Sequence, residues 1–242
     1  MPAGNIHYHS KTAFMKKLLI ILYLFVLLVH VVCRALQWPL AADITKPLLM
    51  PLLITMLIIQ VPNASKHILI LFALLMSWFG DIALMFAGSL SFMIGLAFFL
   101  AAHILYITWL FRSLSAVPSN AKTWQALLAV TLYAVILFRY LLPHLQDMLI
   151  PVLVYTIVIA SMVIVALWLH QKFRNRAAWL MATGAILFVL SDSILAINKF
   201  ALPFDMADAL VMITYGIAQL LITLGVIKFI PERVATKAKT AT

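Results

Sequence analysis

Phe188-Val-Leu-Ser-Asp-Ser-Ile-Leu-Ala-Ile-Asn-Lys-Phe200 is the stretch from which the fold of this chain can be read, because Asp192 lies inside a run otherwise apolar enough for lipid. A second run, Leu75-Met-Ser-Trp-Phe-Gly-Asp-Ile-Ala-Leu-Met-Phe86, repeats the pattern around Asp81. A carboxylate at the centre of a membrane helix costs roughly 2.5–3.5 kcal/mol on insertion scales, so its presence indicates a function. The two runs predict a pair of functional carboxylates inside membrane-spanning helices.

The composition of the whole chain supports a membrane location. The 242 residues are 66% hydrophobic and only 10% charged, and the mean hydropathy is +1.12. A soluble domain carries about 25% charged residues, so we expect a polytopic membrane protein with no separate soluble domain. The net charge of +10 does not indicate nucleic-acid binding, because the basic residues lie in predicted loops and tails. The single cysteine, Cys33, excludes an intrachain disulfide.

Eight segments reach the length of about 20 apolar residues that a membrane-spanning helix needs. We expect them at residues 16–36, 44–61, 67–87, 89–111, 122–142, 147–170, 177–197 and 206–230. No small-residue cleavage site follows the first run, so it is interpreted as a retained span and not a signal peptide. The predicted fold class is all-α, with residues 1–15 and 231–242 as tails around an eight-helix transmembrane domain at 16–230.

The distribution of basic residues predicts the orientation of these spans. With the N-terminus in the cytoplasm, only four of the 17 Lys and Arg residues fall outside: Arg34, Lys46, Arg139 and Lys199. Basic residues concentrate on the cytoplasmic side of membrane proteins, so both termini are expected there. We therefore expect an integral, multi-pass protein of the bacterial inner membrane.

The two aspartate-bearing spans run in the same direction in this topology. Asp81 and Asp192 then lie at a similar depth in the outer half of the membrane and can face one another. The segments around them resemble each other weakly, and Ala101-Ala-His-Ile-Leu105 resembles Ile217-Ala-Gln-Leu-Leu221. This similarity favours two parallel repeats of four spans around one central site.

Further polar residues lie in or at the ends of the spans. The candidates for substrate binding are Lys46, His103, Tyr155, Lys199, Tyr215 and Gln219. Each also has a structural interpretation: the lysines as interface anchors, the tyrosines as packing groups, and the histidine and glutamine as hydrogen bonders between helices. Trp78, one turn before Asp81, is interpreted as packing between helices.

Several familiar enzyme classes lack their motifs here. A catalytic zinc usually takes three His, Cys or carboxylate ligands, whereas His103 alone among the histidines lies well inside a span. The chain contains no His-Glu-x-x-His, no Gly-x-Ser-x-Gly elbow and no glycine-rich phosphate loop. We therefore expect neither a metal nor any other cofactor.

Six short motifs, in their order and spacing, resemble a known family. They are Thr45-Lys-Pro-Leu48, Phe79-Gly-Asp-Ile82, Gly95-Leu-Ala-Phe-Phe99 with His103 and Tyr106, Pro151-Val-Leu-Val-Tyr155, Ser191-Asp192 with Lys199-Phe200, and Tyr215-Gly-Ile-Ala-Gln219. From about residue 40 to 226 the chain is similar to the YhhN-type lysoplasmalogenases. The resemblance implies an eight-span membrane hydrolase that cleaves the vinyl ether bond of lysoplasmenyl-choline or lysoplasmenyl-ethanolamine. The products would be a fatty aldehyde and glycerophosphocholine or glycerophosphoethanolamine.

Asp81 and Asp192 suit this chemistry. Vinyl ether hydrolysis needs an acid that protonates the alkenyl carbon and a carboxylate that stabilises the resulting cation or activates water, as in glycosidases. Two carboxyls close together in a low-dielectric site do not readily both ionise, so one would keep its proton. Lys46 and Lys199 would hold the lipid phosphate. The alternatives are a lipid or small-solute transporter, with the aspartates as gating or coupling residues, and a purely structural membrane protein.

Overall fold

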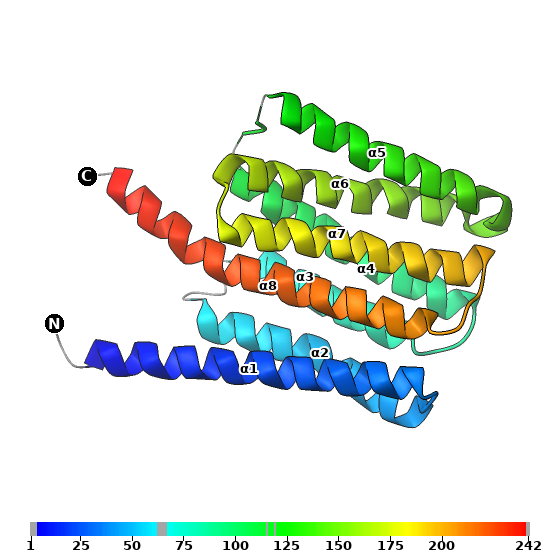
Figure 1. Cartoon of the computed structure of the whole chain (residues 1–242), viewed down its shortest axis with the longest axis horizontal. Helices are drawn as coiled ribbons and strands as arrows, with labels where there is room; N and C mark the ends of the chain where they lie inside the picture. The colour runs from blue at the N-terminus through cyan, green and yellow to red at the C-terminus, as the bar shows by residue number, and fades with distance from the viewer. Residues whose placement is uncertain (1–3, 62–66, 115, 119, 241–242) are drawn as a thin grey trace.

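A computed structural model describes residues 4–61, 67–114, 116–118 and 120–240, which form a bundle of long helices (Figure 1). The helices are α1 (Gly4–Ala35), α2 (Pro39–Gln60), α3 (Ile68–Ala83), α4 (Ser89–Leu114), α5 (Ala121–Leu141), α6 (Leu149–Phe173), α7 (Arg176–Ala196) and α8 (Ala207–Thr240). Two 3-10 turns, Leu142–His144 and Gln146–Met148, join α5 to α6, and a π-helical turn, Ile197–Ala201, follows α7. The predicted all-α class is confirmed. Lys66, one of the thirteen basic residues expected on the cytoplasmic side, lies outside the described residues, as do residues 1–3 and 241–242 of the predicted tails.

Seven helices in the described part of the chain are long and apolar enough to cross a membrane. The exception is α3, whose 16 residues measure about 24 Å at 1.5 Å per residue, against a hydrocarbon core of about 30 Å. A span over residues 67–87 was expected, but the helix ends at Ala83. The chain then turns at Gly88, whose φ of 114° favours glycine, and enters α4.

The ends of several helices follow from local sequence signals. Asn120 and Asn175 each have an extended backbone, and their side-chain oxygens accept hydrogen bonds from Thr123 N at 3.1 Å and Ala178 N at 2.9 Å. These are N-caps of α5 and α7. Pro39 lies in the first turn of α2, where its missing N–H leaves no helix bond unmade.

The closest helix pair, α7 and α8, forms the centre of the bundle. A Cβ atom on Gly184 would lie 2.8 Å from the Ala218 carbonyl oxygen, and one on Gly225 would lie 2.9 Å from the Ala177 carbonyl oxygen. Glycine at these two positions therefore lets the backbones approach closely, which is how membrane helices gain packing contacts.

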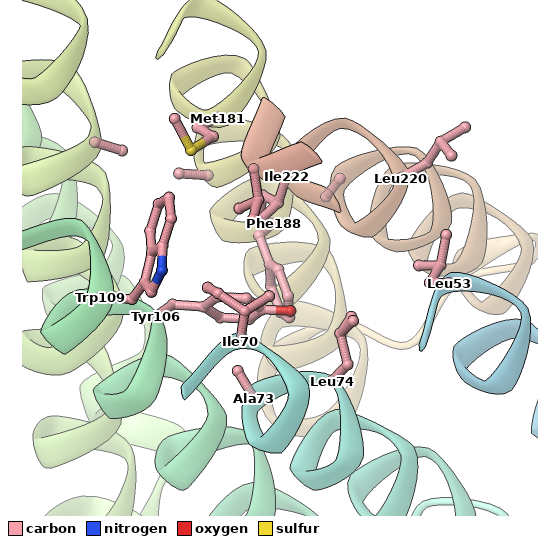
Figure 2. Close-up of a cluster of buried hydrophobic side chains, with 14 of the residues drawn as sticks. Leu53, Ile70, Ala73, Leu74, Tyr106, Trp109, Met181, Phe188, Leu220 and Ile222 are labelled. Atoms are coloured by element: carbon pink, nitrogen blue, oxygen red, sulfur yellow. The ribbon is translucent and has the colours of Figure 1, made fainter. Parts of the chain in front are cut away.

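A buried apolar cluster joins this pair to the N-terminal half of the chain (Figure 2). It includes Leu53, Ile70, Ala73, Leu74, Tyr106, Trp109, Met181, Phe188, Leu220 and Ile222. These side chains come from α2, α3, α4, α7 and α8, so the cluster fixes the helices that carry the two aspartates. In contrast, α5 lies at the edge of the bundle, where it packs mainly on α6 (Figure 1).

Candidate active site

A polar cavity opens between the helices that carry the two aspartates. Side chains from α1, α2, α3, α4, α7 and α8 line it, and the polar ones are Arg34, Lys46, Asp81, Ser191, Asp192, Asp208 and Tyr215. Asp81 and Asp192 therefore reach one cavity from helices more than a hundred residues apart in sequence. Their predicted approach is consistent with this shared lining.

Asp81 is the more enclosed carboxylate. It lies in the last turn of α3, is 2% exposed, and its Oδ2 accepts a hydrogen bond from the Tyr215 hydroxyl at 2.8 Å. Gln219, one turn further along α8, donates to the same hydroxyl at 3.4 Å and accepts from the Tyr106 hydroxyl at 2.8 Å. Gln219 also donates to Ser77 Oγ at 3.0 Å. This network joins α3, α4 and α8 and fixes the position of Tyr215 against Asp81.

Asp192 lies near the C-terminal end of α7 and accepts its hydrogen bond from a different helix. The Tyr155 hydroxyl on α6 donates to Asp192 Oδ2 at 2.6 Å. Each aspartate thus has its own tyrosine donor, which fixes the carboxylate without neutralising it.

A second cavity, lined almost entirely by apolar side chains, begins at Asp192. It lies between α4, α5, α6 and α7, with Phe92, Leu96, Val130, Leu137 and Ile159 among its walls. The polar and apolar cavities share Leu84, Phe99, Asp192 and Leu195. Among the described residues, Asp192 is therefore the only Asp, Lys or Arg whose side chain lines both cavities.

Two further hydrogen bonds position the helices around the two cavities. Tyr133 on α5 is hydrogen-bonded through its hydroxyl to Ser193 Oγ at 2.8 Å, which ties the peripheral helix to α7 beside Asp192. Across the molecule, Trp78 Nε1 donates to the Pro47 carbonyl oxygen at 2.8 Å. In a regular helix the residue 51 N–H would bond that oxygen, but Pro51 has none. Trp78 therefore does pack between helices, and it anchors α3 next to Lys46.

Lys46 is 6% exposed and lies in the polar cavity with Asp81. A snorkelling anchor would extend its ammonium toward water, so this burial favours a role inside the site. Lys199, by contrast, is exposed on the π-helical turn, with its Nζ 5.2 Å from the centre of the Phe92 ring. The structure therefore separates the two lysines that were predicted to act together.

Two other predicted residues lie behind the cavity walls. His103 is fully buried, hydrogen-bonded through Nδ1 to the Phe99 carbonyl oxygen at 2.6 Å, and its ring packs edge to face on Phe188 and Tyr155. Gln219 is also fully buried. Neither lines the polar or the apolar cavity, so both support other site residues and do not face a ligand there.

Sequence reasoning missed two charged residues of the site, Arg34 on α1 and Asp208 in the first turn of α8. Arg34 Nη1 lies 3.9 Å from Asp208 Oδ2, and both line the polar cavity. Arg34 had been counted only as an external basic residue. The available signal was that both lie at the predicted outer ends of their helices, close to the depth of Lys46. Within the described part of the chain, no group of three His, Cys, Asp or Glu side chains could hold a metal ion.

Most of the chain is similar in sequence to known proteins. The model of the YhhN family matches residues 41–226. The human lysoplasmalogenase TMEM86B is 34% identical over 168 residues, covering 69% of this chain and 67% of the human protein. The pig protein of the same name is 38% identical over 155 residues, or 64% and 61% of the two chains. A lysoplasmalogenase of Mycobacterium bovis is 33% identical over 157 residues, or 63% and 58%. No solved structure matches the chain.

Proposed function

The chain belongs to the YhhN family, and we propose that it is a membrane lysoplasmalogenase that hydrolyses the vinyl ether bond of lysoplasmalogens. The observation that carries the proposal is the meeting of a charged cavity and an apolar cavity at Asp192. A lysoplasmalogen has the same two parts, a charged head and one apolar chain, with the cleavable bond between them. Laid across the two cavities, it places its vinyl ether at the aspartates.

The proton donor follows from this placement. In a vinyl ether the carbon that must be protonated is the one further from oxygen, on the chain side of the bond. Asp192 borders the cavity for that chain, whereas Asp81 lines only the polar one. Asp192 is therefore the general acid, and the product of its proton transfer is an oxocarbenium ion at the neighbouring carbon.

The remaining steps begin with Asp81 acting as the general base. Water from the polar cavity adds to the oxocarbenium carbon, and Asp81 takes the proton that this water loses. The hemiacetal then collapses: the ionised Asp192 takes its hydroxyl proton, the carbon–oxygen bond to glycerol breaks, and Asp81 returns its proton to the glycerol oxygen, which restores both carboxyl groups. One water is consumed, and a fatty aldehyde and a glycerophospho-base are formed. Tyr215 and Tyr155 fix the two carboxylates so that neither must reorient during reaction.

Aldehyde release tests the proposal. The purified full chain in detergent should release aldehyde from lysoplasmenyl-ethanolamine or lysoplasmenyl-choline, and should leave the saturated alkyl ether analogue intact. In heavy water the aldehyde, trapped at once by reduction, should carry one deuterium on carbon 2. A transporter needs a sealed bilayer and changes neither lipid, so intact lysoplasmenyl lipid after prolonged incubation would exclude the hydrolase.

We further propose that α3 completes an eighth crossing and that both termini are cytoplasmic. Support comes from α3 packing between α2 and α4 despite its length, and from the thirteen basic residues on the predicted inner side. An aspartate near the end of a short helix lies where water reaches into the membrane-embedded bundle, which suits a hydrolase.

Reporter fusions check this topology. A fusion after residue 230 should report a cytoplasmic location, and one in the turns at 142–148 should report an external one. A fusion in the α1–α2 connection near residue 37 should also be external. A cytoplasmic signal from residues 142–148 would contradict the proposed number of crossings.

A further inference from the structure

A third cavity continues the site beyond the polar one. It lies between the α1–α2 and α7–α8 connections, with Arg34, Gln37, Trp38, Asn198, Asp205 and Asp208 among its lining residues. Arg34 and Asp208 line both this cavity and the polar one. The three cavities therefore form a series in which Asp192 is shared by the first two, and Arg34 and Asp208 by the last two.

The charges change sign along this series. Among the described residues, and apart from the two catalytic aspartates, Lys46 is the charged residue that lines only the polar cavity, Arg34 and Asp208 line both it and the outer cavity, and Asp205 lines only the outer one. A lysophospholipid with a choline or ethanolamine head group presents its charges in the complementary order, phosphate first and ammonium two carbons further out. Trp38 also lines the outer cavity, and aromatic rings attract ammonium groups.

The contact between Arg34 and Asp208 is suited to exchange for a ligand. The 3.9 Å separation lies at the long end of ion-pair distances, and the two side chains are 26% and 58% exposed. Such exposed pairs contribute little to stability. Arg34 Nε is buried without a hydrogen-bond partner among the described residues, so the guanidinium keeps a donor for an anion. A guanidinium binds phosphate through two parallel hydrogen bonds, which a 3.9 Å contact to carboxylate does not satisfy.

We propose that Arg34 and Asp208 form a head-group subsite that selects zwitterionic lysophospholipids, with Arg34 on the phosphate and Asp208 on the ammonium. The proposal rests on the lysoplasmalogenase function for the identity of its substrate. Arg34 precedes residue 41, where the family match begins, so α1 adds this contact from outside the matched segment. Lipids whose head group is a bare phosphate gain Arg34 but are repelled by Asp208.

Binding of two lipids that cannot be hydrolysed tests the subsite without depending on catalysis. The probes are radiolabelled 1-O-hexadecyl-glycero-3-phosphocholine and 1-O-hexadecyl-glycero-3-phosphate, measured on the full chain in lipid nanodiscs. Arg34→Gln should weaken both probes about tenfold, because each loses a charge-assisted contact to phosphate. Asp208→Asn should weaken the phosphocholine probe several-fold and strengthen the phosphate probe, so the preference between them changes by about tenfold.

Matched variants separate this role from folding and from general charge effects. Arg34→Lys keeps the cation and should bind both probes within about threefold of the original chain. Arg112→Gln and Asp147→Asn make the same charge changes at exposed positions that line none of the three cavities, and should change neither affinity.

The outcomes distinguish the subsite from the hydrolase activity. Altered probe preference without aldehyde release by the original chain would support the subsite and overturn the hydrolase. Aldehyde release with unchanged probe binding in both Arg34→Gln and Asp208→Asn would overturn the subsite alone. Equal weakening of both probes by Asp208→Asn would also overturn it, because a residue that only supports the fold has no preference between head groups.

Discussion

Asp81–Tyr215 and Asp192–Tyr155 are chemically the same pair in two different surroundings. In each, a tyrosine hydroxyl donates to one carboxylate oxygen, at 2.8 Å and 2.6 Å. The first pair is enclosed with Lys46 in the polar cavity, whereas the second borders a cavity without a lysine or arginine in its lining. Identical groups acquire different roles when their environments differ, which is how paired carboxyls divide acid and base work.

Of the substitutions that test this comparison, Asp192→Asn is expected to lower kcat the most. Asn is nearly isosteric with Asp but cannot protonate carbon, and no other carboxyl among the described residues lines the apolar cavity. We expect kcat to fall by about 10³–10⁴, the upper part of the range for a positioned acid. The remaining activity should lose its decline at high pH, because that decline reports deprotonation of the acid. Stopped assays of aldehyde release across a range of pH measure both kcat and its decline at high pH. Asp147→Asn, at an exposed position, is the control.

Asp81→Asn should have a smaller effect, about 10²–10³ on kcat, because water can still add to the cation without a base. Its residual activity should instead lose the decline at low pH, where the base becomes protonated. The double variant should be little worse than Asp192→Asn, since the two groups act as a unit. Both single variants should remain folded, because Asn has nearly the shape of Asp and its side-chain oxygen can still accept the tyrosine hydrogen bond. If both variants lost the same limb of the pH profile, the division of labour would be wrong.

The tyrosines provide a finer test of the same comparison. Tyr155→Phe and Tyr215→Phe each remove one hydrogen bond to a carboxylate, and should lower kcat about tenfold while leaving KM nearly unchanged. Tyr215→Phe should also lower the thermal stability, because Gln219 and Tyr106 belong to its buried network. Within the described part of the chain, the Tyr155 hydroxyl is hydrogen-bonded only to Asp192 and belongs to no such network. If the two variants lost the same amount of melting temperature, the buried network around Tyr215 would add no stability beyond that of the Tyr155 hydrogen bond.

The lysines should show the smallest effect. Lys46→Ala is expected to raise KM several-fold with little change in kcat, because uniform binding of the phosphate is lost. Lys199→Ala should change KM less, since Lys199 is exposed and its Nζ lies over the Phe92 ring outside the polar cavity. Initial-rate kinetics with micellar substrate compare the two. If Lys199→Ala changed KM more than Lys46→Ala did, the bound phosphate would lie near Lys199 and not in the polar cavity.

Hydropathy predicted the helices well because lipid imposes one simple length and one simple composition on every span. It overestimated α3, where Leu84, Met85 and Phe86 extend the apolar pattern beyond the last helical residue, Ala83. Apolar residues are acceptable in a turn as well as in a helix, so their presence could not mark the end of the helix. The suggested repeat of four spans stays a prediction.

The site was partly predictable for an equally physical reason. An aspartate in lipid is costly wherever it stands, so Asp81 and Asp192 were recognisable without knowing their neighbours. The hydrogen-bond donors of the two aspartates could not be predicted. Tyr155 and Tyr215 become their partners only when α6 packs on α7 and α8 packs near α3. Arg34 lies at a helix end, where arginine is inexpensive, and the only signal that the sequence offered was its predicted depth close to that of Lys46.

The position of Asp192 between two cavities also determines where the reaction products are left. A bond broken at this point leaves an aldehyde in the mainly apolar cavity and a glycerophospho-base in the cavity that holds the charged side chains. The first can dissolve in the bilayer past α5, the least enclosed helix, and the second can dissolve in water past Arg34 and Asp208. Hydrolysis thus separates an amphiphile into two molecules with opposite solubility, and neither product retains the contacts on both sides of Asp192 that held the intact lipid.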